Sequence, residues 1–341
     1  MWQVVGQDKI ISLLRLSLEK NTVAHAYLFA GPAHVGKMTL ALNLAQALNC
    51  GASEYPCGEC LSCQKIASGK HSDVQIIGLN GNADSAGGRP QREISIEQIR
   101  ELQHSVILPP FEGKYKVFII DGAEYLSGEA ANCLLKTLEE PQEKIIFILL
   151  TASENLLPET VISRCQRLEL APPAIKDVEN ALNSRWGIDP QKAHLLVRLA
   201  QKRPGWAISA YQEEGLLQQR DERLQRLISI TSDNQNENFT YAAELAAQFN
   251  KNREMVQEIL ALWLNWWRDI LLVKIGCTES ITNIDFIGQL TEITSEYETN
   301  QIKTFIRSMQ TAGEQLRQNA NPQLVLEVLM LSIPNKRRVL K

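Results

Sequence analysis

Hydrophobic residues are spaced differently in the two halves of this chain. In the first half, near-continuous apolar runs at 26–31, 73–79, 116–121 and 144–151 alternate with segments of helical periodicity, and a short last run follows at 166–170. Such runs are typical of strands covered on both faces, and their alternation with helices indicates crossover connections. The first half therefore predicts an α/β domain with a parallel sheet.

Beyond the double proline at 172–173 the strand pattern stops and helical periodicity dominates. A short helical part, interrupted by a Pro-Gly break at Pro204, precedes a longer all-helical part. We therefore expect three parts: residues 1–172, 173–212 and 213–341.

Three tryptophans, Trp263, Trp266 and Trp267, crowd the most hydrophobic helical segment. Helical spacing makes an aromatic stripe easy to bury, which favours packing in a core or an interface. Stacking on nucleobases is the alternative.

The composition is that of a globular protein, with 341 residues, 44% hydrophobic and 22% charged residues, and a formal net charge of -4. This mildly acidic balance argues against wholesale coating of nucleic acid, although it allows a local basic patch. No apolar run reaches the roughly 18 to 20 residues that a membrane span needs, and the N-terminus has no signal-peptide pattern. We expect a cytoplasmic protein with no membrane partner.

Gly31, Gly36 and Lys37 match the P-loop pattern G-x-x-x-x-G-K between a predicted strand and a predicted helix. Such glycines let consecutive N–H groups point at phosphate oxygens, and the lysine reaches the terminal phosphates. Met38, however, stands where a hydroxyl ligand for Mg²⁺ belongs, and Thr39 points about 100° further round the helix. The pattern predicts a P-loop fold rather than a chance match, and it leaves nucleotide binding open.

Asp121 ends a predicted buried strand, which is the position of a Walker B aspartate that holds Mg²⁺. Hydrolysing enzymes of this class usually place a glutamate next, to polarise the attacking water. Here that residue is Gly122, and Glu124 lies on the following turn. The loss at Gly122 and the loss at Met38 both indicate a degenerate nucleotide site.

Four of the seven cysteines, Cys50, Cys57, Cys60 and Cys63, occupy one short segment with the spacing C-x6-C-x2-C-x2-C. A reducing compartment disfavours disulfides, and four thiolates at this spacing can enclose one tetrahedral Zn²⁺ with no open position. We expect a structural zinc module at about 50–63. The alternatives are unligated thiols and a ligand set that includes His71.

Several motifs together resemble one family. GPAHVGK, the four-cysteine segment, VFIIDGAEYLS, LLKTLEEP and ISRC, in this order, and the late segment QLRQNANPQLVLEVLML are similar to the AAA+ subunits of the bacterial DNA polymerase III clamp loader. The resemblance implies an AAA+ domain, a helical lid and an all-α collar. It also implies gamma/tau and delta subunits as partners in a hetero-pentamer, with a sliding clamp and primer-template DNA.

The departures from the motor subunits of that family are those of its non-hydrolysing delta prime members. Met38 and Gly122 replace catalytic residues, and no sensor arginine stands near Ile208. From charge alone Arg164 would be a surface cation, but the resemblance implies an arginine finger that acts in trans on a neighbour's ATP site. The rivals are an active gamma/tau-like ATPase that uses Thr39 or a water, and a free-standing zinc-dependent DNA-binding protein.

Overall fold

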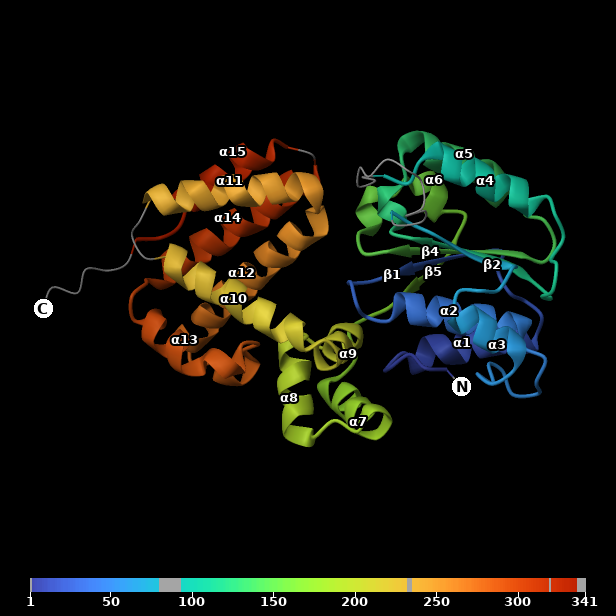
Figure 1. The fold of residues 1–341 in the computed structure, drawn as a ribbon, viewed down its shortest axis with the longest axis horizontal. Coiled ribbons are helices and arrows are strands. Elements are labelled where there is room, and N and C mark those ends of the chain that lie inside the picture. The colour runs from blue at the N-terminus through green and yellow to red at the C-terminus, as the bar shows by residue number, and fades with distance from the viewer. Residues whose placement is uncertain (1, 80–92, 232–234, 319, 336–341) are drawn as a thin grey trace, which may run out of the picture. The chain divides into compact units, whose positions relative to one another are not determined.

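A computed structural model describes residues 2–79, 93–231, 235–318 and 320–335 (Figure 1). The chain forms two compact units. One comprises Met1–Trp186 with Lys202–Gly205, and the other comprises Gly187–Gln201 with Trp206–Lys341. The finer division into three domains at 172 and 212 remains a prediction.

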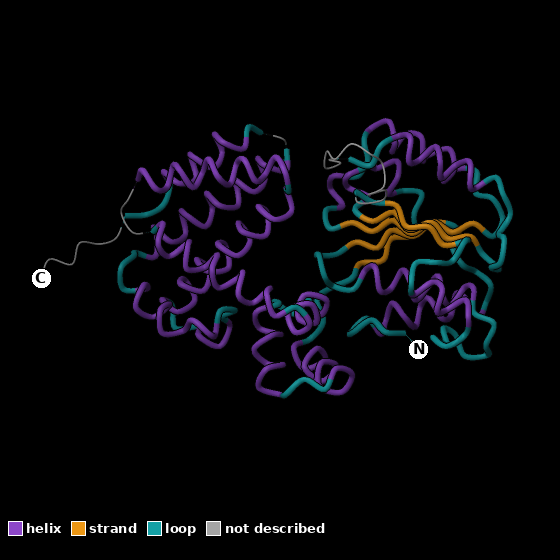
Figure 2. The backbone as a smooth tube through the Cα atoms, viewed as in Figure 1, coloured by secondary structure: helices purple, strands orange, loops and turns teal. Residues whose placement is uncertain are grey.

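The first unit is built on a five-stranded sheet in which every pair of neighbouring strands is parallel, in the order β2-β3-β4-β1-β5 (Figure 2). The predicted parallel sheet is confirmed, because each apolar run forms a strand. The strands are β1 (Ala26–Ala30), β2 (Val74–Ile77), β3 (Lys116–Asp121), β4 (Ile145–Thr151) and β5 (Gln166–Glu169).

Helices cover both faces of this sheet, as Figures 1 and 2 show. Strand residues alternate between two apolar clusters: Ile119 and Ile148 pack on one face, while Phe118 and Phe147 pack on the other. Both faces are buried, and this explains why the strands read as continuous apolar runs. One layer contains α1 (Asp8–Glu19), α2 (Lys37–Asn49) and α3 (Leu61–Ala67), and the other contains α4 (Ile96–Val106), α5 (Gly128–Glu139) and α6 (Glu159–Ile162).

Serine caps fix where two of these helices begin. The Ser95 hydroxyl accepts a hydrogen bond from the Gln98 amide, and the Gln98 side chain accepts one from the Ser95 amide. Ser127 caps α5 in the same way by accepting from the Ala130 amide at 3.1 Å. Each cap satisfies a backbone donor that the helix itself leaves unpaired. The 3₁₀ turns η1 (Ala123–Tyr125) and η2 (Glu154–Leu156) and the helix α7 (Ile175–Trp186) complete this unit.

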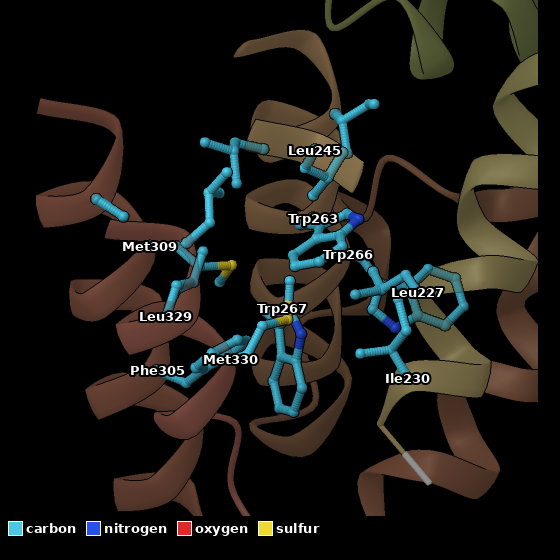
Figure 3. Close-up of a cluster of buried hydrophobic side chains, with 14 of the residues drawn as sticks. Leu227, Ile230, Leu245, Trp263, Trp266, Trp267, Phe305, Met309, Leu329 and Met330 are labelled. Atoms are coloured by element: carbon cyan, nitrogen blue, oxygen red, sulfur yellow. The ribbon is translucent and has the colours of Figure 1, made fainter. Parts of the chain in front are cut away.

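The second unit is entirely helical in the residues described. Its core surrounds α12 (Arg253–Lys274), whose Trp263, Trp266 and Trp267 are at most 1% exposed (Figure 3). Side chains this deeply buried have no free face for a nucleobase, so core packing is confirmed. The helices are α8 (Pro190–Leu199), α9 (Pro204–Gln212, from Trp206 on), α10 (Glu214–Ile230), α11 (Gln235–Lys251), α12 (Arg253–Lys274), α13 (Ile287–Thr294), α14 (Thr299–Arg317) and α15 (Pro322–Leu331), with 3₁₀ turns η3 (Thr278–Ser280) and η4 (Ile284–Phe286).

A buried carboxylate joins α12 to the segment that follows it. One Asp269 oxygen accepts hydrogen bonds from the Thr282 amide at 2.9 Å, the Asn283 amide at 2.7 Å and the Asn283 side chain at 2.8 Å. Burial raises the pKa of Asp269, although these donors oppose the shift. Since buried polar groups must find partners, this carboxylate fixes the path of residues 282–283.

Among the described residues, no helix combines the length and the apolar character that crossing a bilayer requires.

Candidate functional site

The P-loop lies between β1 and α2, as its pattern predicts. Gly31 and Gly36 have φ angles of 154° and 103°, which residues with a side chain rarely adopt. Space is also restricted, since a Cβ atom on Gly31 would lie 2.4 Å from the Leu170 carbonyl oxygen. A Cβ on Gly36 would lie 2.9 Å from Val4. Both glycines are therefore required by the path of the loop.

Lys37, the first residue of α2, folds back over this loop. Its Nζ donates to the carbonyl oxygens of Gly31 at 2.6 Å and Pro32 at 2.8 Å. Burial lowers the pKa of Lys37, while the nearby charges of Glu124 and Asp121 oppose the shift. The ammonium group thus contacts the loop and is close enough to two acidic residues for their charges to act on it.

Met38 is half-buried and packs against the apolar cluster that contains Trp2 and Val4. A thioether is a poor ligand for Mg²⁺, and this one serves the core instead. Thr39 is half-buried in the first turn of α2. The residue directly after Lys37 therefore contributes packing and no metal ligand.

Asp121 ends β3 at an exposed position, yet the surrounding protein partly desolvates its carboxylate and raises its pKa, while Lys37 opposes the shift. Gly122 follows in a left-handed conformation, with φ 74° and ψ 50°. A Cβ atom there would lie 2.7 Å from Cδ2 of Tyr125. The backbone after Asp121 is therefore shaped for glycine, and a glutamate does not fit it without rearrangement.

Glu124, the nearby acidic residue, uses one of its two carboxylate oxygens in a structural contact. Its Oε1 accepts a hydrogen bond from the amide of Ala152, directly after β4, at 2.9 Å. Its Oε2 is buried, and among the described residues it has no hydrogen-bond partner. One carboxylate oxygen is thus committed to the end of the neighbouring strand.

The four cysteines converge as their spacing predicts. Their sulfur atoms all lie within 4.8 Å of one another. The Cys50 sulfur lies 3.5 Å from that of Cys57 and 4.0 Å from that of Cys60, and the Cys57 and Cys63 sulfurs lie 3.9 Å apart. Four thiolates at about 2.3 Å from one tetrahedral ion lie about 3.8 Å from one another. The cluster therefore has the dimensions of a metal site.

Backbone amides support thiolates in this cluster. The amides of Ala52, Cys60 and Cys63 point at the sulfurs of Cys50, Cys57 and Cys60 at 3.5, 3.3 and 3.5 Å. The amide of Cys60 is the main cause that lowers the pKa of Cys57 to about 6, while burial raises the pKa of Cys63 to about 12. A bound cation would offset the cost of deprotonating the buried thiol.

His71, the alternative ligand, is engaged elsewhere. Its Nε2 is 3.1 Å from the Ser62 hydroxyl, and its Nδ1 accepts from the Asp73 amide at 3.1 Å. The group of potential ligands found in the described residues comprises the four cysteines without it.

Sequence reasoning missed the contacts of the loop 111–114, which link it to the residue before β2 and to the cysteine module. The buried Asp73 carboxylate accepts from the amides of Phe111, Glu112 and Gly113, each at 2.7 Å. Lys114 donates to the Cys50 carbonyl oxygen at 3.0 Å. The only signal in the sequence was that Asp73, an acidic residue, directly precedes an apolar run. That signal does not predict hydrogen bonds with amides about 40 positions away.

Arg164 lies between α6 and β5, at the amino end of β5, whereas the P-loop follows the carboxyl end of β1. Because β1 and β5 are parallel, the two features lie at opposite ends of the strands: Arg164 at the amino ends and the P-loop at the carboxyl ends. The partly exposed guanidinium donates from Nη1 to the Thr160 carbonyl oxygen at 2.8 Å and from Nη2 to the Glu139 carboxylate at 2.5 Å. Arg164 is thus remote from this chain's own P-loop, and its partner Glu139 was not predicted from the sequence.

Comparisons with known proteins agree with these features. Residues 6–174 match the family described as "DNA polymerase III, delta subunit", and residues 214–334 match its C-terminal domain. The chain is 28% identical over 329 residues to DNA polymerase III subunit delta' of Bacillus subtilis, covering 96% of each protein. It is 42% identical over 168 residues to subunit tau of the same organism, covering 49% of this chain and 28% of tau.

The solved structure of a gamma subunit-related protein from Thermotoga maritima aligns with 95% of this chain and 98% of its own, at 20% identity and a TM-score of 0.47. The two family matches together extend over both units of the chain, and the delta' alignment runs nearly its whole length. This chain belongs to the DNA polymerase III delta subunit family, as a homologue of delta'.

Proposed function

We propose that this chain is a non-hydrolysing delta prime subunit of a clamp loader. The observation that carries the proposal is the backbone at Gly122, which is left-handed and closed by Tyr125 where a motor subunit needs its catalytic glutamate. Met38 supports the same conclusion, because it packs into the core at the position of the Mg²⁺ ligand. Gly31, Gly36, Lys37, Thr39 and Asp121 would hold a nucleotide, if one binds, without the means to hydrolyse it.

Arg164 would act on a neighbouring subunit as an arginine finger. Its position at an exposed edge away from the P-loop suits contact with another chain, and its guanidinium is always charged. Arginine supplied in trans stabilises the negative charge that develops on a transferring phosphoryl group. In GTPases this contribution is worth about 10³ to 10⁵ in rate. The chain would therefore matter to catalysis without performing it.

We propose that the four cysteines hold Zn²⁺. All four potential ligand atoms are cysteine sulfurs and their separations suit one tetrahedral ion, so the metal would be structural. Lys114 donates to the carbonyl oxygen of Cys50, and this contact supports a role for the metal in holding the loop 111–114.

The partners proposed are gamma/tau and delta subunits in a hetero-pentamer that places a sliding clamp on primer-template DNA. The surface of α15 supports assembly through the helical unit. Leu324, Val328 and Leu331 are 61%, 57% and 62% exposed and recur at i, i+4 and i+7, which places them on one helix face. An exposed apolar stripe of this kind is typical of a protein interface.

A second candidate function is an active gamma/tau-like ATPase. The identity with tau over the first half, and the retention of Lys37 and Asp121 near each other, favour it. Purified protein separates the two functions: ATP turnover of about 1 per second that disappears in Lys37→Ala would establish the ATPase.

The arginine-finger role is tested in a reconstituted loader whose other ATPase sites are inactivated, so that turnover reports only on the site next to this chain. Arg164→Ala should lower DNA-stimulated turnover by about a hundredfold or more. Arg167→Ala is the matched control, since it removes an exposed arginine that is paired with Glu154 from the same region and should leave turnover unchanged. Equal turnover for the two variants would remove Arg164 from catalysis.

A further inference from the structure

We propose that Glu139 is a positioning residue, which holds the Arg164 guanidinium in the orientation needed to reach a neighbour's nucleotide. This inference rests on the proposed arginine-finger function. It adds a second residue, 25 positions earlier in the chain, to the machinery that this subunit would contribute.

The contact has the geometry of an orienting interaction. Nη2 of Arg164 donates to Oε1 of Glu139 at 2.5 Å, and Nη1 donates to the Thr160 carbonyl oxygen at 2.8 Å. Two bonds from different nitrogens of a planar group fix both its position and its plane. The remaining N–H groups of the guanidinium are left to meet phosphate oxygens.

Both groups that hold the guanidinium belong to anchored elements: Thr160 lies in α6, whose Val161 is buried in the same cluster as residues of α5. Glu139 is the last residue of α5, whose Leu134 and Leu138 are buried against the sheet. Gln103 of α4 donates to the Cys133 carbonyl oxygen of α5 at 2.8 Å and so joins the two helices. An arginine held between such elements has fewer accessible rotamers than a free surface arginine.

Stability does not explain the pair. Its side chains are 34% and 49% exposed, and ion pairs with that much solvent contribute little to folding. Glu139 also lies at the negative end of the α5 dipole, where Lys136 of the same turn and Arg164 both supply compensating charge. The position therefore suits a carboxylate that has Arg164 to bind.

The test uses the same loader with one active neighbouring site and compares Glu139→Ala with Glu140→Ala. The control removes an adjacent, exposed carboxylate that does not pair with Arg164. Glu139→Ala should lower kcat by about tenfold or more with little change in KM for ATP, because the arginine stays present but is poorly placed. Glu140→Ala should change neither value. Glu139→Gln keeps the acceptor oxygen and should recover most of the lost kcat.

A double variant connects the effect to Arg164. In an Arg164→Ala background, Glu139→Ala should cause no further loss, because residues that act as a unit are not additive. If Arg164→Ala lowers turnover while Glu139→Ala does not, or if the two losses multiply, the positioning role is wrong and the finger remains. If Arg164→Ala itself has no effect, the proposed function fails, and the inference fails with it.

Discussion

Restoring the missing catalytic glutamate should not restore an ATPase in this chain. In the variant Gly122→Glu, with or without Met38→Thr, the new side chain enters a backbone that is held at φ 74° and ψ 50°. If the loop lacked only the glutamate side chain, this substitution would restore ATPase activity. The conformation of the loop indicates instead that the backbone after Asp121 differs from the one a catalytic base needs.

The cost of this substitution can be worked out from two contributions. A left-handed conformation costs a residue with a side chain about 1 to 2 kcal/mol. The new Cβ would also lie 2.7 Å from Cδ2 of Tyr125, so the ring must move. Overpacking of this kind costs about 1 to 3 kcal/mol. Gly122→Glu should therefore lower the free energy of unfolding by about 2 to 5 kcal/mol.

Urea unfolding gives this free energy, and a steady-state ATPase assay gives turnover. Gly128→Glu is the matched control: Gly128 begins α5, has open space around its Cβ position and lies in the first turn, where a glutamate is favourable. It should not lower stability. A Gly122→Glu, Met38→Thr variant that is as stable as the parent, or that turns over ATP at about 1 per second, would refute the reasoning.

Two further predictions concern the metal site and the helical unit. Metal analysis of the parent should find one zinc per chain, which Cys60→Ser should lose together with part of the thermal midpoint of the first unit. Cys277→Ser, at an exposed thiol, should keep the metal. Zinc retained in Cys60→Ser would show that the ligand set is wrong. Asp269→Ala should lower the free energy of unfolding of the second unit by about 2 to 4 kcal/mol, because it leaves the donors of Thr282 and Asn283 unpaired. Asp269→Asn keeps one acceptor oxygen and should cost less in the same urea titration, so equal losses would contradict this account.

The strands were predictable because both faces of the sheet are buried. Every position of β1 and β4 is buried, so hydrophobicity alone marks their extent. The P-loop and the cysteine module were predictable for a related reason, since their geometry is set by residues close together in the sequence. Short-range chemistry of this kind leaves a pattern of residue types at fixed spacing.

The partners of the candidate site residues were not predictable. Glu139 meets Arg164 because α5 and the α6 region meet above the sheet, and Asp73 meets the amides of 111–113 because β2 and β3 are neighbours. Neither pairing follows from spacing along the chain. The turn at Gly122 was also only partly predictable. The sequence shows that the glutamate is missing, but only the position of Tyr125 shows that a glutamate side chain would not fit there.

The opposite placement of the P-loop and Arg164 gives this subunit a direction. The four residues of β5, about 13 Å of extended chain, separate the amino ends of the strands near Arg164 from their carboxyl ends near the P-loop. A neighbour that used Arg164 as proposed would bind at one of these ends, and a neighbour that offered an arginine to the P-loop would bind at the other. Subunits joined in this head-to-tail manner form a polar series rather than symmetric pairs. A member that, as proposed, gives an arginine but has no use for receiving one would belong at a terminal position, where the series stops.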